Sequence, residues 1–168
     1  MSCPSIVDER QRVGNWELDT VIGRCGGVVL VTAAERKTRF SVIGLASNKT
    51  AEAAKKAILD ALTPLAAWVK KLTYDNGKEF ALHEDIAKAL NASGYFAHPY
   101  HSWERGLNEN TNGLIRQYVP KGTSMDDLTQ LEVNSIMDRL NNRPRKCLGF
   151  RTPNQVLFGI DPPIALAS

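Results

Sequence analysis

The chain has 168 residues, of which 43% are hydrophobic and 23% charged, a balance typical of one globular domain with its own core. Lysine and arginine number 21 against 18 acidic residues, so the net charge is +3, which permits a polyanionic partner without requiring one. No apolar stretch approaches the roughly 20 residues that cross a bilayer, and the N-terminus lacks the pattern of a secretory signal. Three widely spaced cysteines fit reduced thiols. We therefore expect a cytoplasmic protein.

The first part of the chain predicts an antiparallel meander. Residues 16–22 alternate with the period of a strand, Gly26 and Gly27 make a turn, and residues 28–34 and 40–45 give two further strands. Helical spacing follows over 54–65, where Pro64 disturbs the end. A short strand at 72–75 stops at Asn76-Gly77, a helix covers about 79–91, and another strand covers 95–97.

The last third is predicted to be helical. One helix spans 107–118, and a second begins after Ser124 as N-cap, with Asp127 in a place like that of a capping box, and ends before Pro144. This order of elements predicts an α/β fold, a mixed sheet with crossover helices. No linker divides the chain, so we expect an arm at 1–12, a core at 13–160 and a tail at 161–168.

Three acids are candidates for chemistry, and each also has an ordinary explanation. Asp19 lies in the middle of a strand, where aspartate is depleted, although it could be a solvent-facing acid at an edge. Asp75 ends a strand, where open α/β sheets bind ligands, although Asp-Asn-Gly is also good turn chemistry. Glu109 lies just inside a helix rich in asparagine and glycine, where an acid also favours the helix dipole.

Together the three acids suggest a metal site. Carboxylates that converge on one point repel one another unless cations lie between them, and oxygen ligands suit Mg²⁺. Two such ions about 4 Å apart would clamp the attacking and leaving oxygens of a phosphoryl transfer. A zinc site at His83, His98 or His101 is disfavoured because the ligand spacing is missing. A glycosidase using two of the acids is also disfavoured, because no aromatic-lined cleft is indicated.

Basic and polar residues near Glu109 are candidates for DNA contacts. Arg116 and Asn112 share its helix face, although a surface arginine would look the same. Residues 139–151 include several basic residues and no acidic one, and these basic residues could bind phosphates or could simply be solvated. Tyr100 and Trp103 could stack on bases or pack in the core. The candidate DNA contacts are Arg116, Asn112, Lys121, Arg143, Arg145 and Lys146.

Four ordered blocks of sequence resemble insertion-sequence-thirty-type DDE transposases. They are residues 14–23 (GNWELDTVIG), 74–81 (YDNGKEFA), 103–118 (WERGLNENTNGLIRQY) and 141–149 (NNRPRKCLG), with Thr152-Pro153 just beyond. The resemblance covers about residues 8–159. Three departures are Asn15 in place of the usual His, Leu18 in place of Gly, and His98 in place of Asp.

The resemblance implies a ribonuclease-H-like integrase core, with three antiparallel strands followed by two parallel ones. Asp19, Asp75 and Glu109 would be the metal-binding catalytic triad for two Mg²⁺ or Mn²⁺ ions, with Arg116 contacting transposon-end DNA. The implied reactions are strand nicking by water and then strand transfer to target DNA, by a homo-oligomer in a bacterial cytoplasm, on the nucleoid when bound to DNA.

The resemblance also implies an N-terminal helix-turn-helix region that recognises the ends of the element. This chain begins almost at the core, so we expect an excised or truncated protein. The alternative function is a DNA-binding or dimerising module without activity of its own, since a core without end recognition would not assemble productively.

Overall fold

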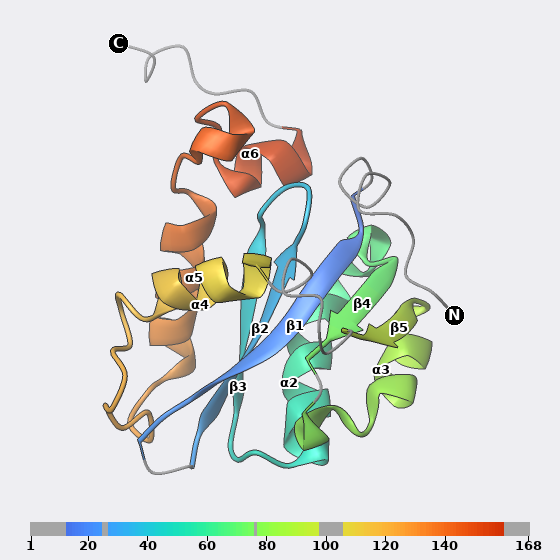
Figure 1. Ribbon diagram of the computed structural model, residues 1–168, viewed down its shortest axis with the longest axis vertical. Helices are drawn as coiled ribbons and strands as arrows, with labels where there is room; N and C mark the ends of the chain where they lie inside the picture. Colours follow the sequence, from blue (N-terminus) through green and yellow to red (C-terminus); the bar gives the residue numbers. More distant parts are fainter. Residues whose placement is uncertain (1–12, 25–26, 76, 98–105, 160–168) are drawn as a thin grey trace.

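A computed structural model describes residues 13–24, 27–75, 77–97 and 106–159. Five strands form one sheet in the order β3-β2-β1-β4-β5 (Figure 1). The strands are β1 (Asn15–Ile22), β2 (Val29–Glu35), β3 (Ser41–Ala46), β4 (Lys71–Tyr74) and β5 (Ser93–Phe96). The pairs β1–β2 and β2–β3 are antiparallel, and β1–β4 and β4–β5 are parallel. The predicted mixed five-stranded sheet is confirmed, with β1 at its centre.

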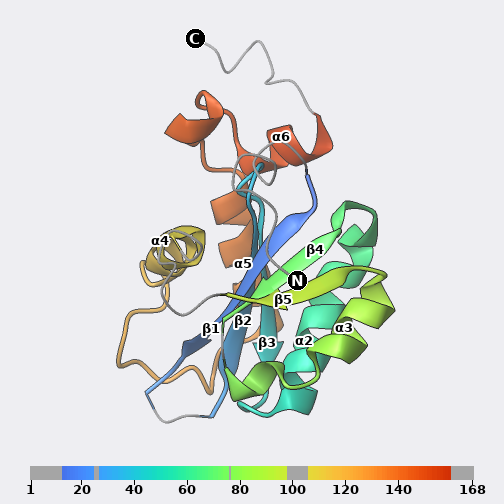
Figure 2. The same ribbon diagram turned by 45° about the vertical axis from the view of Figure 1, so that its right-hand side comes forward.

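Helices cover both faces of the sheet (Figure 2). The α-helices are α2 (Ala51–Leu62), α3 (His83–Leu90), α4 (Gly106–Ile115), α5 (Gln130–Asn141) and α6 (Pro153–Phe158). The short 3₁₀ helices of the described residues are η1 (Thr63–Trp68), η2 (Lys78–Phe80) and η4 (Lys146–Leu148). α2 and α3 lie on one face of the sheet, and α4 and α5 lie on the other.

Alternation along β1 sends side chains into two separate cores. Trp16 and Leu18 are fully buried with α2 and α3, whereas Val21 packs with Ile115 of α4 and with α5. The odd positions of β1, including Asp19, therefore face α4. This places Asp19 beside the helix that carries Glu109.

The predicted helix over 79–91 is divided in the structure. Lys78–Phe80 forms η2, and α3 begins only at His83. Phe80 is fully buried and packs on the Tyr74 ring, with 5.2 Å between centroids, and the carbonyl of Phe80 lies 3.1 Å from Nδ1 of His83. Burial of Phe80 fixes this turn, which helical periodicity could not indicate.

The predicted N-cap at Ser124 is wrong, because α5 begins six residues later. Ser124 Oγ accepts the N–H of Asp126 in a local turn. Thr129 is the N-cap instead, and it exchanges reciprocal hydrogen bonds with Glu132 in a complete capping box. Thr152 caps the unpredicted α6 in the same way with Gln155.

The expected arm (1–12), the expected tail (161–168), Tyr100, Trp103, His98 and His101 lie outside the described residues. Within the part that the structure describes, no helix is long and apolar enough to cross a membrane.

Candidate functional site

Asp19, within β1, and Asp75, directly after β4, lie next to each other where the parallel pairing of these two strands ends. Leu18 of β1 is in register with Tyr74 of β4, so the two aspartates occupy the next position of each strand. The N–H of Asp75 continues the ladder by donating to the carbonyl of Leu18 at 3.3 Å. Parallel pairing of β1 with β4 therefore brings together two acids that are 56 residues apart in sequence.

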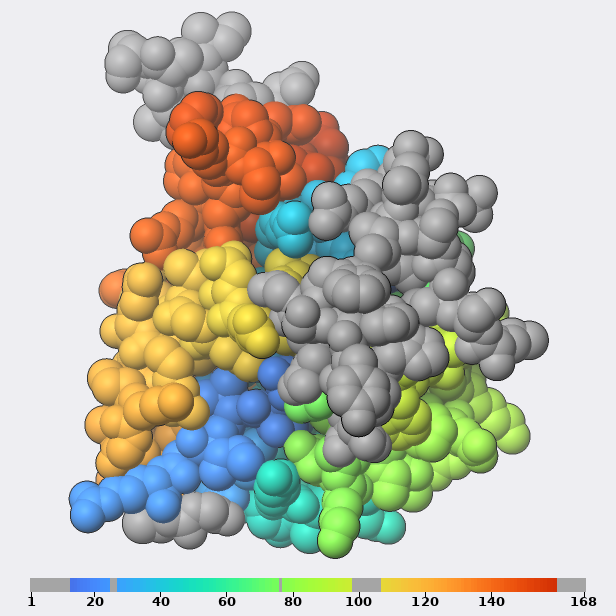
Figure 3. All heavy atoms as spheres, viewed as in Figure 1, coloured from blue at the N-terminus to red at the C-terminus, as the bar shows by residue number. Residues whose placement is uncertain are grey.

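Both aspartates line one cavity of about 560 Å³. It lies where β1 ends, between the segment that enters α2 and the segment that follows β4, and these segments meet at the lower edge of Figure 3. Both aspartates are half-buried. The described residues that line this cavity are Asp19, Thr20, Ile22, Lys49, Asp75, Gly77, Lys78 and Glu79.

The carboxylate of Asp19 is held by two donors. Its Oδ1 accepts the N–H of Thr20 at 2.8 Å, and its Oδ2 accepts Nδ2 of Asn112 at 2.8 Å. Thr32 of β2 donates through Oγ1 to Oδ1 of Asn112 at 3.3 Å. Asn112 was predicted as a DNA contact. In the structure its amide links α4 to Asp19, a contact that sequence reasoning did not indicate.

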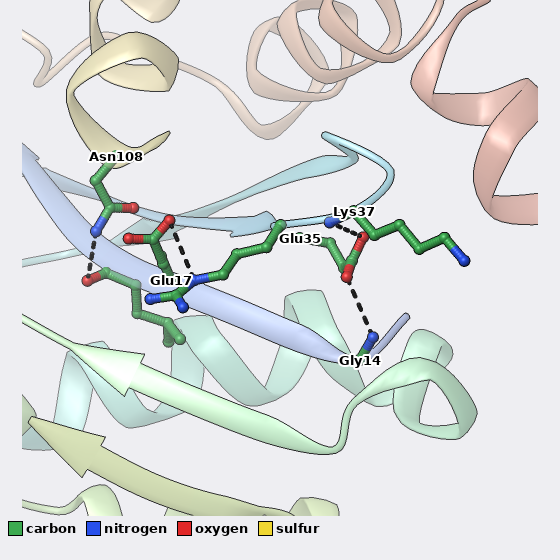
Figure 4. Close-up of polar contacts among 7 residues, drawn as sticks. Gly14, Glu17, Glu35, Lys37 and Asn108 are labelled. Atoms are coloured by element: carbon green, nitrogen blue, oxygen red, sulfur yellow. Dashed lines mark hydrogen bonds and ion pairs between the residues drawn. The ribbon is translucent and has the colours of Figure 1, made fainter. Parts of the chain in front are cut away.

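Asn108, also on α4, fixes the helix against the central strand. Its amide donates to the carbonyl of Leu18 at 3.4 Å, and its side chain is 5% exposed (Figure 4). Glu109 is the next residue of the helix, but its side chain is exposed and does not line the cavity. Within the described ranges, no three His, Cys, Asp or Glu side chains are grouped so that they could hold a metal ion. The structure thus brings Asp19 and Asp75 together and leaves Glu109 at the edge of the site.

Glu79 is a third carboxylate at the cavity, and the sequence analysis did not select it. It is 6% exposed, and its Oε1 accepts the hydroxyl of Thr20 at 2.9 Å. A Cβ atom on Gly77 would lie 2.5 Å from Oε2 of Glu79, so this carboxylate packs directly on the turn after Asp75. The only available signal was the position of Glu79 four residues after Asp75, which is also an ordinary place for an acid at a helix start.

Two other buried acids belong to the framework. Glu35, at the far end of the β1–β2 pair, accepts the N–H groups of Gly14 and Lys37 (Figure 4). It also accepts the N–H of Thr38. Glu17 lies 3.6 Å from Nε of Arg36 in a buried ion pair. Glu35 closes the turn between β2 and β3, and neither acid lines the cavity.

The predicted DNA-contact residues occupy several different environments. The guanidinium of Arg116 donates to the carbonyls of Ile22 (3.1 Å) and Val119 (3.5 Å). Arg145 donates to the carbonyl of Leu140, and burial, followed by the nearby Arg143, lowers its pKa. Both arginines therefore support the backbone. Lys121, Arg143 and Lys146 are exposed, and Arg143 contacts Gln117.

No family model matches the chain, but known transposases are similar to it in sequence. The transposase for insertion sequence element IS4351 of Bacteroides fragilis is 47% identical over 152 residues, which are 90% of this chain and 47% of that protein. Transposase InsI for insertion sequence element IS30A of Escherichia coli is 39% identical, over 90% of this chain and 39% of that protein. This chain is homologous to IS30-type insertion-sequence transposases. It spans less than half the length of these two relatives.

Solved structures agree on the fold. The catalytic core domain of BIV integrase matches with a TM-score of 0.65 and 20% identity, over 88% of this chain and 95% of that one. A chain of the simian T-cell lymphotropic virus intasome matches with a TM-score of 0.68 and 17% identity, over 91% of this chain and 56% of that one. The fold is therefore that of an integrase catalytic core, as the sequence predicted.

Proposed function

We propose that this chain is the catalytic core of a DNA transposase, in which Asp19, Asp75 and Glu109 hold divalent metal ions for phosphoryl transfer. The observation that carries the proposal is the position of Asp19 beside Asp75, where the parallel pairing of β1 with β4 ends, in one cavity. Homology to transposases that include this region supports it. Carboxylate oxygens are the donors that Mg²⁺ and Mn²⁺ prefer, so the donor set fits such ions.

The chain's own residues would bind the ions and orient the DNA. Asp19, held by Thr20 and Asn112, is oriented before any ion arrives, and the main chain of Asp75 is held by its hydrogen bond to Leu18 of β1. α4 would have to present Glu109 toward them. When bound, such ions neutralise charge on the attacking and leaving oxygens of the phosphodiester. In the first reaction water would attack the phosphorus and displace the 3′-oxygen. In the second, the freed 3′-hydroxyl would attack the phosphorus of a target phosphodiester and displace the target's own 3′-oxygen.

Asp75→Asn tests this proposal. The substitution keeps the shape of the side chain and removes one charged ligand, so nicking of plasmid DNA in Mg²⁺ or Mn²⁺ should fall to the level seen without metal. Gel electrophoresis measures the nicked product, and an unchanged melting temperature shows that the fold is retained. Asp138→Asn, at an exposed site on α5, is the control with the same change of charge. Undiminished nicking by Asp75→Asn would exclude the proposed role.

The second candidate is a DNA-binding module without activity. It is favoured by the exposed position of Glu109 outside the cavity lining. Anomalous scattering from crystals soaked in Mn²⁺ separates the two candidates. A peak bound by Asp19 and Asp75 with Glu109 nearby supports the transposase core, whereas salt-sensitive DNA binding with neither a peak nor nicking supports the silent module.

A further inference from the structure

The cavity has an asymmetric distribution of charge. The carboxylates of Asp19, Asp75 and Glu79 line it together with two lysines, Lys49 and Lys78. These lysines come from separate segments, since Lys49 directly precedes the N-cap of α2 and Lys78 is the first residue of η2. Two segments that are distant in sequence thus place a cation on the same rim, on the side of the cavity away from α4.

Both lysines are available to a ligand. Each is exposed, and within the described residues neither ammonium group has a hydrogen bond or an ion pair. Lys55 and Lys56 of the neighbouring α2 differ, because they pair with Asp85 and Asp60. Arg116 and Arg145, which the sequence suggested as DNA contacts, already donate hydrogen bonds to main-chain carbonyls.

A phosphodiester that reaches Asp19 and Asp75 brings more negative charge to an already acidic cavity. Lysine ammonium groups beside such a site neutralise phosphate oxygens as point charges, without reading base sequence. Contacts of this kind also release counterions from DNA and make binding sensitive to salt. Lys49 and Lys78 are therefore placed to hold the backbone of the strand that enters the cavity.

We propose that Lys49 and Lys78 form a phosphate-binding rim that holds the DNA backbone on the α2 side of the cavity. The inference rests on the proposed function, because it takes DNA as the substrate. It adds a contact surface to the one predicted along α4 and the segment 139–151. Its ligand is the backbone of duplex DNA, independent of sequence.

The double variant Lys49→Gln and Lys78→Gln tests the rim. Binding is measured by fluorescence anisotropy in EDTA, which prevents cleavage, with a labelled mixed-sequence duplex about three helical turns long. Affinity at low salt should fall by about tenfold or more, and the dependence of log K on log salt should become shallower by about 2, or about 1 for each lysine.

The matched control is Lys70→Gln and Lys88→Gln. Both lysines are exposed, Lys70 lies at the opposite end of β4 from the cavity, and Lys88 is on α3, so the control has the same change of net charge. If Lys49 and Lys78 form the rim, this control should bind the duplex nearly as tightly as the unmodified chain does. An equal loss of DNA affinity in both double variants, or no loss in either, would contradict the proposed rim.

Failure of the rim and failure of the proposed function are distinguishable. If both double variants bind DNA equally while the unmodified chain still nicks plasmid in Mn²⁺, the rim is wrong and the transposase core stands. If the unmodified chain neither binds the duplex nor nicks plasmid, both proposals are wrong.

Discussion

At the scale of single residues, the site needs acidic side chains and also neighbouring groups that hold those side chains in place. Both carboxylate oxygens of Asp19 accept hydrogen bonds, one from its own strand and one from Asn112 on α4. Such contacts limit rotation of the carboxylate. The contact with Asn112 also joins the strand that carries Asp19 to the helix that carries Glu109.

Asn112→Ala should weaken metal use more than it weakens folding. Loss of the amide leaves Asp19 free to rotate, and loss of an outer-shell partner typically costs about 10–100-fold in metal affinity or activity. The concentration of Mn²⁺ that gives half-maximal nicking measures the effect. Asn110→Ala, at an exposed position on the same helix, is the control. Equal metal requirements in the two variants would contradict a positioning role for Asn112.

At the scale of elements, capping hydrogen bonds set the residues at which the helices in the last third of the chain begin. The Thr129–Glu132 capping box satisfies two N–H groups that would otherwise lack partners at the start of α5. α5 in turn covers the β3 edge, where Asn141 donates to the carbonyl of Ser41 and accepts its N–H, both at 2.8 Å. These side-chain bonds satisfy the backbone N–H and carbonyl of Ser41 at the start of this edge strand.

Thr129→Ala should lower the free energy of unfolding by about 1 kcal/mol, because it removes the side chain that accepts the N–H of Glu132. Urea denaturation followed by circular dichroism measures the change. Ser124→Ala tests the rejected N-cap position and should have a smaller effect, since Ser124 makes only local turn contacts. The reverse order of the two effects would contradict the assigned start of α5.

At the scale of the whole molecule, one layer of helices packs on each face of the sheet, and the central strand β1 contributes different side chains to the two interfaces. On the α2 side, the approach is close enough that Gly44 has no room for a side chain. A Cβ atom there would lie 2.7 Å from the carbonyl oxygen of Ala57. The distance between α2 and β3 therefore depends on this glycine, and α2 adjoins the candidate site through the segment that contains Lys49.

Gly44→Ala should destabilise the protein by about 1–3 kcal/mol, because the added methyl group meets helix backbone rather than a movable side chain. The melting temperature by calorimetry measures the loss. Gly113→Ala is the control, since nothing lies within 4 Å of a Cβ at that position of α4, and a better helix former should leave stability unchanged or raise it. A neutral Gly44→Ala would contradict the close packing of α2 on β3.

The sequence by itself predicted the order of the five strands and of most helices, and it indicated Asp19 and Asp75 as candidates, because alternation, helical spacing and a strand-ending acid are local patterns. It could also have shown α6, whose Thr-Pro-x-Gln start is a readable cap. Only the tertiary structure decided that Asn112 bonds to Asp19, that Phe80 divides a predicted helix, and that Lys49 and Lys78 share a cavity with both aspartates. The physical reason is that each of these contacts joins residues from different elements, and their geometry exists only after β1 pairs with β4 and the helices pack on the sheet.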